Sequence, residues 1–220
     1  IMNRPWFLPI LRKYLGRNIK VILHQFNNYF MEMNHNRVKK YLELADGFIG
    51  CSNFTVKAEV LERFPEWKDK CFHVSNGVDI DKFNPDELSR NSLDILRKVY
   101  GIRNNDVVVL YVGRLTKDKG SGELLRAVKT LITNFGLRQL KLMIVGSSFF
   151  GGQTKITPFI KELHSAAREI QGNTVFTGFV NRPEMPSIFG LANIVVVTSI
   201  TMDASPALCY EASAMKLPIV

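Results

Sequence analysis

Runs of apolar residues typical of buried strands alternate along this chain with segments that have the apolar period of helices. Strands are predicted over residues 19–24, 47–51, 72–75, 107–112, 140–145, 174–179 and 194–198. Helices are predicted over residues 36–45, 53–64, 93–100, 122–134, 158–170, 183–189 and 208–215. Because strands that are continuously apolar need cover on both faces, this alternation predicts an α/β fold with parallel sheets and helices on both sides.

A polar stretch between residues 79 and 106 interrupts this alternation and contains Pro85 with several Asn and Asp residues. Such a stretch is typical of a domain boundary. We expect a first domain over residues 1–84, a connection over 85–105 and a second domain over 106–220. The chain begins at Ile1, without an initiator Met, and ends in an apolar run that resembles the start of a strand. We therefore expect both domains to be incomplete, and the piece alone to be poorly soluble and inactive.

The composition is that of a globular protein, with 46% hydrophobic and 22% charged residues. A total of 29 Lys and Arg against 20 Asp and Glu gives a formal net charge of +9. A basic balance suits nucleic acid, an anionic membrane or an acidic substrate. The cations are spread along the predicted helices, without a block of like charges, and this distribution argues against a nucleic-acid partner.

The chain has three cysteines, and none of them forms a C-x-x-C pair. Isolated cysteines in apolar surroundings argue against a disulfide framework and against a zinc site. No stretch of about twenty apolar residues is present, as a transmembrane helix would need. We therefore expect a cytoplasmic protein without a transmembrane segment, and a peripheral contact with a membrane stays open.

The strand-to-helix turn after residue 112 combines glycines, two cations and the start of a helix. Gly113 and Arg114 follow the strand, and Lys119 and Gly120 directly precede the predicted helix. Backbone N–H groups and the helix dipole favour anions at such a place, and Arg and Lys add full charges. The sequence predicts a diphosphate site here, with a nucleotide-sugar as the leading ligand. A turn with incidental surface cations is the alternative.

Other phosphate and metal motifs are absent or incomplete. A P-loop would need a second glycine where Asp118 stands and a hydroxyl residue where Gly120 stands. The glycine-rich loop over residues 146–152 does not have the spacing of a dinucleotide fingerprint. Asp79 and Asp81 form a D-x-D pair, but they lie in the polar connection rather than at the end of a strand. We expect neither a metal nor another cofactor.

Two carboxylates flank the last predicted loop, which contains Pro206. Asp203 precedes this proline, and Glu211 lies in the predicted helix that follows it. Both come after a strand of the predicted parallel sheet, at the edge where open α/β sheets bind ligands, and carboxylates accept hydrogen bonds from sugar hydroxyls. Taken alone, Glu211 is more simply interpreted as a first-turn helix residue that suits the helix dipole.

Together these motifs make the chain resemble glycosyltransferase family 4, which has the two-domain GT-B architecture. Within that family the chain is similar to the branch of spore-coat-associated glycosyltransferases. The matching residues are, in order, Asn3-Arg4-Pro5, His24, Asn76-Gly77-Val78-Asp79, Phe83, Pro85, Gly113-Arg114, Lys119-Gly120, Val145-Gly146, Phe176-Thr177-Gly178, Ser199, Glu211-Ala212 and Pro218. They follow the family order through nearly the whole chain.

The resemblance implies two Rossmann-like domains and transfer of a sugar from a nucleotide-diphosphate donor with retention of the anomeric configuration. Arg114 and Lys119 would hold the diphosphate, Glu211 the ribose and Asp203 the donor sugar, while His24 would be an active-site histidine of the first domain. The implied catalytic residues are His24, Arg114, Lys119 and Asp203. The implied donor-binding residues are Gly113, Arg114, Lys119, Gly146, Phe179, Asp203 and Glu211. The acceptor would be a lipid-linked molecule or a glycan of the cell envelope or spore surface.

Two departures from the family pattern lie in the last loop. Asp203 stands where the family usually has Glu, and Ala204-Ser205-Pro206 replaces a Gly-Phe-Gly sequence. These changes favour an alternative, a degenerate sugar-nucleotide-binding or structural coat protein without activity. Arg114, Lys119 and Glu211 are intact and favour an enzyme. We expect it in the cytoplasm, or peripheral to the membrane or the spore coat.

Overall fold

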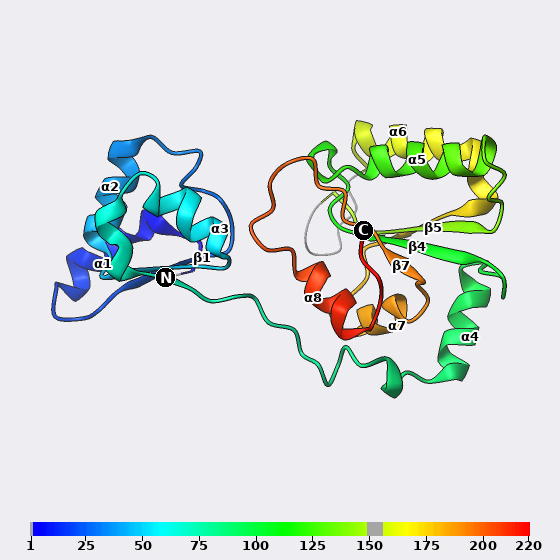
Figure 1. Ribbon diagram of the computed structural model, residues 1–220, viewed down its shortest axis with the longest axis horizontal. Coiled ribbons are helices and arrows are strands. Elements are labelled where there is room, and N and C mark those ends of the chain that lie inside the picture. Colours follow the sequence, from blue (N-terminus) through cyan, green and yellow to red (C-terminus); the bar gives the residue numbers. More distant parts are fainter. Residues whose placement is uncertain (1, 149–155) are drawn as a thin grey trace. The chain divides into compact units, whose positions relative to one another are not determined.

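The computed structural model describes residues 2–148 and 156–220 (Figure 1). Its contacts divide the chain into two compact units. The first unit consists of Ile1–Gly77 with Asp203–Ala207, and the second of Val78–Met202 with Leu208–Val220. Each unit has its own sheet, and all strand pairs in both sheets are parallel. The predicted α/β fold with parallel sheets is confirmed, whereas the predicted domain boundaries stay a prediction.

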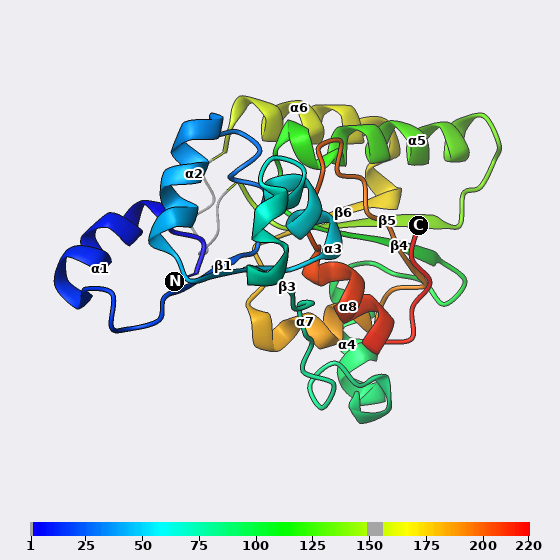
Figure 2. The ribbon, with the colours of Figure 1, turned by 60° about the vertical axis from the view of Figure 1, so that its left-hand side comes forward.

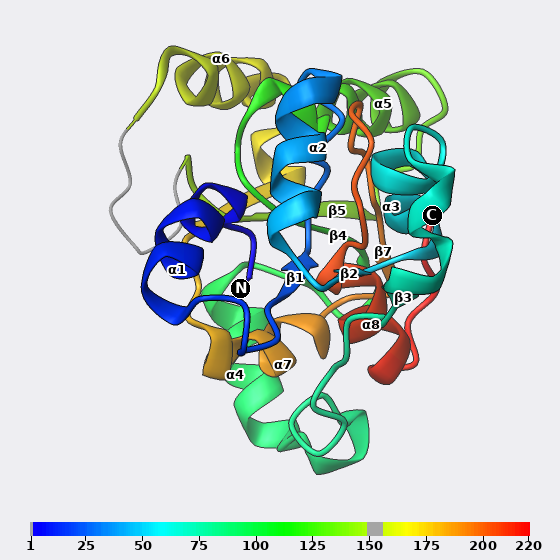
Figure 3. The ribbon, with the colours of Figure 1, turned by 90° about the vertical axis from the view of Figure 1, so that its left-hand side faces the viewer.

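The first unit is built on a three-stranded sheet in the order β1-β2-β3. Its strands are β1 (Ile22–Gln25), β2 (Gly47–Gly50) and β3 (Cys71–His73), and its helices are α1 (Leu8–Leu15), α2 (His35–Leu44) and α3 (Asn53–Val56). Helix α1 packs beside α2, and α3 packs beside β2 and β3 (Figure 2, Figure 3). Leu8, Leu23, Leu42 and Phe48 are fully buried in its core.

Side chains close the ends of the helices and fix α1 against β1. Asn34 accepts a hydrogen bond from the backbone of Arg37, and Ser52 caps α3 in the same way. Asp46 accepts hydrogen bonds from the backbone of Val21 and from Arg12, which lower the pKa of its carboxyl group to about 2. Through these two hydrogen bonds, Asp46 in the segment after α2 is joined to α1 and to the start of β1.

The second unit has a four-stranded sheet in the order β6-β5-β4-β7. Its strands are β4 (Val107–Val112), β5 (Leu140–Val145), β6 (Thr174–Gly178) and β7 (Ile194–Val195). Its helices are α4 (Arg90–Val99), α5 (Ser121–Thr133), α6 (Pro158–Ala167), α7 (Met185–Phe189) and α8 (Ala207–Ala214). Helices α5 and α6 cover one face of the sheet, and α4, α7 and α8 lie on the other (Figure 1).

Both faces of β4 are buried, as its continuous apolar sequence predicts. Val108 and Leu110 belong to the core on the side of α7, while Val109 and Tyr111 belong to the core under α5 and α6. The alternation of side chains along a strand produces this division. The final apolar run pairs with β7, because Ile219 bridges Val195 in parallel.

The structure differs from the predicted elements at several ends. The predicted helix over residues 53–64 is α-helical only in α3 and continues as a π-helix over Lys57–Leu61. The helix predicted to reach residue 170 is α-helical only to Ala167 and continues as a 3₁₀-helix over Arg168–Asn173, in which Ile170 has non-helical dihedral angles. Helix α1 was not predicted, although Pro5 and Pro9, residues that are tolerated in the first helical turn, mark its start.

Candidate functional site

A cavity of about 140 Å³ lies at the carboxyl edge of β4, β5 and β6 in the second unit. It is lined by Val112, Gly113, Arg114, Val145, Gly146, Ser147, Phe179, Val180 and Met185. Four residues of the predicted donor-binding set are among them: Gly113, Arg114, Gly146 and Phe179. The structure therefore brings together residues that lie up to 66 positions apart in the sequence, since 179 − 113 = 66.

Backbone hydrogen bonds continue beyond the ends of the strands and shape the cavity floor. Gly113 donates to the carbonyl of Val145 at 3.0 Å, and Gly146 donates to the carbonyl of Gly178 at 2.9 Å. Gly146 has φ +138°, and a Cβ added there would lie 1.9 Å from the carbonyl oxygen of Gly113. Only glycine fits this close approach of two loops.

Replacing Gly146 by alanine is expected to lower the free energy of unfolding by about 1–3 kcal/mol and to distort the cavity. Gly172→Ala is the matched control, because a Cβ at Gly172 would have no neighbour within 4 Å. Urea unfolding of both variants measures the difference. Equal stability of the two variants would contradict this account of Gly146.

Arg114 leaves the end of β4 and faces a carboxylate on the same turn. Its guanidinium lies 3.6 Å from the carboxylate of Asp118, and the side chain is 38% exposed. The neighbouring Thr116 side chain and the charge of Arg114 hold the pKa of Asp118 below its usual range. The ion pair with Asp118 therefore orients the Arg114 side chain at the edge of the cavity. Asp118 itself stands where a P-loop would have its second glycine.

Lys119 lies on the same turn but does not line the cavity. Its ammonium is 3.5 Å from the hydroxyl of Ser199, and its carbonyl accepts a hydrogen bond from the Thr198 hydroxyl at 2.9 Å. The backbone N–H of Ile200 also donates a hydrogen bond of 2.9 Å to the backbone carbonyl of Asp118. These contacts connect the cation-bearing turn to the loop after β7.

Glu211 lies in α8, and its position corrects the sequence interpretation. Helix α8 begins at Ala207 and has no acidic residue in its first turn, so the interpretation of Glu211 as a first-turn residue is wrong. Burial raises the pKa of its carboxyl group, and the charge of Arg182 partly offsets this effect. A half-buried carboxylate of this kind suits hydrogen bonding to hydroxyl groups.

In the first unit, His24 lies in β1 with its ring centroid 4.1 Å from that of Phe26. Burial is the main cause that lowers the pKa of His24, so its neutral form is favoured. The next residue, Gln25, is fully buried, and within the described part of the chain its amide atoms and Nε2 of His24 have no hydrogen-bond partner. Gln25 was not predicted as a site residue, although a polar residue at the end of an apolar strand is a detectable signal.

Asp203 belongs to the first unit by its contacts, whereas Arg114, Lys119 and Glu211 belong to the second. The loop around Asp203 is joined to the first unit by a hydrogen bond of 2.9 Å from the Asn76 amide to the carbonyl of Ser205. The predicted meeting of Asp203 with the other site residues therefore stays a prediction.

Comparison with known proteins identifies the family. The model of the family "Glycosyl transferases group 1" matches residues 93–220, more than half of the chain. The chain belongs to this family. It is 27% identical to the putative glycosyltransferase YtcC of Bacillus subtilis, over 100% of this chain and 54% of that protein. It is also 30% identical to the lipopolysaccharide 1,2-N-acetylglucosaminetransferase of Salmonella typhimurium, over 90% of this chain and 47% of that protein.

Two further matches concern a coat protein and a solved structure. Spore coat protein SA of Bacillus subtilis is 23% identical, over 100% of this chain and 58% of that protein. The structure of Anabaena HepE in complex with UDP and glucose matches with a TM-score of 0.75 and 20% identity, over 99% of this chain and 56% of that one. The fold is thus that of GT-B glycosyltransferases. The chain spans about half the length of the relatives it matches.

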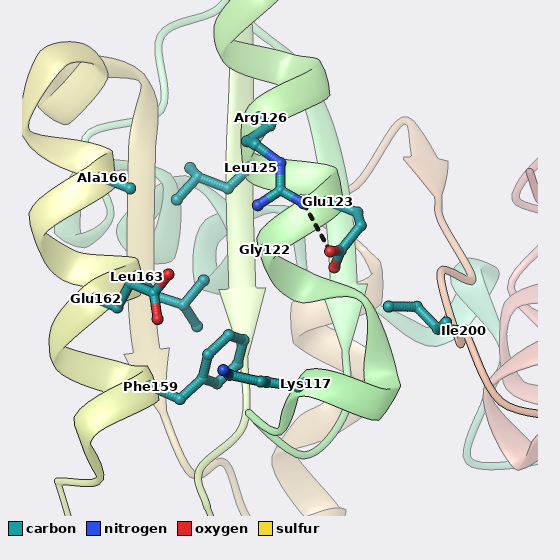
Figure 4. Close-up of a pocket in the computed structure, with 10 residues that line it drawn as sticks. All are labelled: Lys117, Gly122, Glu123, Leu125, Arg126, Phe159, Glu162, Leu163, Ala166 and Ile200. Carbon is teal, nitrogen blue, oxygen red and sulfur yellow. Dashed lines mark hydrogen bonds and ion pairs between the residues drawn. The ribbon is translucent and has the colours of Figure 1, made fainter.

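A larger pocket of about 440 Å³ lies between α5 and α6 (Figure 4). Leu125, Leu163 and Phe159 form its apolar wall, and an ion pair of 2.6 Å joins Arg126 to Glu123 at its rim. None of the predicted site residues lines this pocket. We therefore place the candidate functional site at the smaller cavity, because Arg114, Gly113 and Gly146 all line it.

One carboxylate of the D-x-D pair, that of Asp79, is engaged in a local contact. Asp79 lies 2.7 Å from the ammonium of Lys82, which lowers the pKa of its carboxyl group. Among residues 2–148 and 156–220, no three His, Cys, Asp or Glu side chains are placed to share a metal ion.

No helix in the same ranges is long and apolar enough to cross a membrane. The glycine-rich loop predicted over residues 146–152 lies partly outside the described residues.

Proposed function

We propose that this chain is part of a retaining glycosyltransferase of family 4 that binds a nucleotide-diphosphate-sugar donor at the carboxyl edge of β4–β6. The observation that carries the proposal is the cavity shared by Gly113, Arg114, Gly146 and Phe179. The glycines let the donor approach the backbone, and Arg114 supplies the positive charge. The UDP and glucose bound to HepE, a protein of the same fold, support this choice of ligand.

The chemistry requires stabilisation of the leaving group. The acceptor hydroxyl oxygen forms a bond with the anomeric carbon on the face from which the diphosphate leaves, by front-face attack or through a short-lived ion pair. The bond between that carbon and the diphosphate oxygen breaks, and the hydroxyl proton passes to the diphosphate. Arg114, Lys119 and the N-terminus of the 13-residue helix α5 neutralise the charge that develops there.

We assign the remaining roles by chemistry. Phe179, Val180 and Met185 offer an apolar wall to the nucleobase, and Glu211 accepts hydrogen bonds from the ribose. Asp203 contacts the donor sugar. Because its side chain is one methylene shorter than the Glu that is usual in the family, Asp203 changes which donor sugar is preferred. Neutral His24, with buried Gln25 beside it, serves the acceptor side in the first unit. The acceptor is a cell-envelope or spore-surface glycan or a lipid-linked precursor of one.

A transfer assay tests the proposal. The complete natural protein is incubated with a series of UDP- and GDP-sugars, and release of the nucleoside diphosphate is measured with and without envelope extract as acceptor. We expect release from one donor and its loss in the Arg114→Ala variant. Binding of donors without any release would favour the alternative, a degenerate sugar-nucleotide-binding or structural coat protein, which the Ala204-Ser205-Pro206 loop and the likeness to spore coat protein SA support.

Glu211→Ala is expected to weaken nucleotide binding about 10-fold for every sugar carried by the donor, because one buried hydrogen-bond acceptor of the ribose is lost. Glu169→Ala is the control, since Glu169 is exposed in the same unit and pairs with Lys129, away from the start of α5. Isothermal titration calorimetry with the nucleoside diphosphate measures both. An unchanged affinity for Glu211→Ala would remove Glu211 from the site.

Activity is expected to survive EDTA, because Arg114 and Lys119 replace a metal ion as the positive charge and Asp79 already pairs with Lys82. The assay compares turnover before and after chelation. Complete loss that Mn²⁺ or Mg²⁺ restores would instead assign the D-x-D pair to a metal.

A further inference from the structure

The polar segment that follows β7 is joined to the turn that carries the two cations. The apolar run that contains β7 ends at Thr198 and Ser199. The Thr198 hydroxyl donates a hydrogen bond of 2.9 Å to the backbone carbonyl of Lys119, which lies 79 positions earlier in the sequence. All of these residues belong to the second unit. The proposed sugar transfer gives a role to Lys119 but none to Thr198.

The turn and the segment after β7 also meet through their backbones. Gly120 has φ +68°, and a Cβ added there would lie 1.9 Å from the carbonyl oxygen of Thr198. The backbone N–H of Ile200 donates to the carbonyl of Asp118, and Ile200 lies beside the start of α5 (Figure 4). The turn is therefore held against this segment on both sides of Lys119, at Asp118 and at Gly120.

The Lys119 side chain is held more firmly at its backbone end than at its ammonium. A lysine side chain is a flexible stem that loses conformational entropy when its ammonium is fixed on a ligand. The ammonium of Lys119 lies 3.5 Å from the Ser199 hydroxyl, at the long limit of a hydrogen bond. A charged phosphate oxygen is a stronger partner and replaces such a contact. The bond from Thr198 to the Lys119 carbonyl is shorter and leaves the ammonium available to a ligand.

We propose that Thr198 is a positioning residue for the diphosphate of the donor. Its hydroxyl fixes the peptide group that follows Lys119, and so sets the point from which the ammonium reaches the ligand. A charge that is already in place costs less to bring onto a ligand than a charge on a mobile turn. The inference rests on the proposed function, because it needs the diphosphate at Lys119. The alternative is that this hydrogen bond stabilises the fold without influence on the ligand.

Two variants of Thr198 separate its hydroxyl from the shape of its side chain. Thr198→Val removes the hydroxyl and keeps the volume, whereas Thr198→Ser keeps the hydroxyl and removes a methyl group. Isothermal titration calorimetry of the complete natural protein with UDP, or with GDP where UDP does not bind, measures the effect. We expect Thr198→Val to lower the affinity about 10-fold, the scale of one lost hydrogen bond, and Thr198→Ser to bind normally.

Thr130→Val is the matched control for the loss of a hydroxyl. Thr130 also donates its hydroxyl to a backbone carbonyl, that of Arg126 at 3.0 Å, but it is exposed further along α5. We expect the affinity of this variant for the nucleoside diphosphate to be unchanged. Urea unfolding of each variant measures its stability, so that an effect on folding is detected separately from an effect on binding.

A double-mutant cycle with Lys119→Ala gives a readout that a purely structural role would not produce. If Thr198 acts through the ammonium, Thr198→Val has no further effect on affinity once that ammonium is removed. If Thr198 supports the cavity in general, the two losses add. The affinity for uridine or guanosine, which carry no phosphate, is expected to be the same in Thr198→Val and in the natural protein, as measured by ligand-observed NMR.

The possible failures of the inference and of the proposed function are distinguishable. Normal affinity of Thr198→Val for the nucleoside diphosphate would overturn the inference and leave the proposed function in place. An equal loss in Thr198→Ser, a loss for the nucleoside, or additive losses in the cycle would do the same, because the hydroxyl would then not act through Lys119. Absence of UDP and GDP binding by the natural protein would contradict the proposed function itself, and the inference with it.

Discussion

Replacing Arg114 or Lys119 by alanine is expected to lower kcat/KM for sugar transfer by about 100-fold or more. This is the effect of losing one charged group that stabilises a developing anion. Arg114 borders the cavity at the end of β4, and Lys119 is held on the same turn by contacts with Thr198 and Ser199. Steady-state kinetics with the preferred donor measures the effect.

Lys117→Ala is the matched control for these two variants. Lys117 is an exposed cation on the same turn, and it faces the pocket between α5 and α6 instead of the cavity (Figure 4). We expect its kinetics to stay near normal. If all three variants lost activity equally, the general charge of the turn would be responsible, and the specific roles of Arg114 and Lys119 would be wrong.

Between pH 4.5 and pH 8, the contribution of Glu59 to the stability of the first unit is expected to fall as pH rises. This residue is fully buried in the π-helical turn, and burial raises the pKa of its carboxyl group from 4.5 to about 8. The backbone N–H groups of Phe30 and Met31 and the charge of Arg63 oppose that rise, and the charge of Glu32 adds to it. The folded state therefore keeps a proton that the unfolded state releases above pH 4.5.

The sign and size of this effect follow from proton linkage. Because the folded state binds more protons in this window, the free energy of unfolding falls with pH by up to about 1.4 kcal/mol per unit. Glu59→Gln, which keeps a neutral amide at all pH values, is expected to remove this slope. Glu62→Gln is the control, since Glu62 is exposed on the same segment. Urea unfolding at several pH values tests the prediction, and parallel curves for Glu59→Gln and the natural protein would refute it.

In the second sheet, the predicted strands agree best with the structure where both faces of a strand are buried, because such a strand has a nearly continuous apolar sequence. The bounds of β4 and β5 agree with the predicted strands, because all of their side chains except that of Lys141 are apolar. Strand β7 is shorter than predicted and ends at Val195, although Val197 still donates to the carbonyl of Val220 and the Thr198 hydroxyl donates to the carbonyl of Lys119. These contacts depend on segments that are distant in the sequence, which periodicity does not reveal.

The cavity could be predicted because its residues follow strand ends. Gly113, Arg114, Gly146 and Phe179 come after three strands, and parallel strands place such loops at one edge. The burial of Glu59 and Gln25 was not predicted, because a polar residue becomes buried only through packing of other elements around it. The meeting of Asp203 and His24 with the donor depends on the placement of the first unit relative to the second, which sequence motifs do not determine.

A crystal structure of the complete natural protein with its nucleoside diphosphate tests the central claim most directly. The account predicts diphosphate oxygens within hydrogen-bonding distance, about 3 Å, of Arg114 and Lys119, with the nucleoside beside Gly146 and Phe179. A nucleotide bound between α5 and α6, or one that contacts neither Arg114 nor Lys119, would contradict the account.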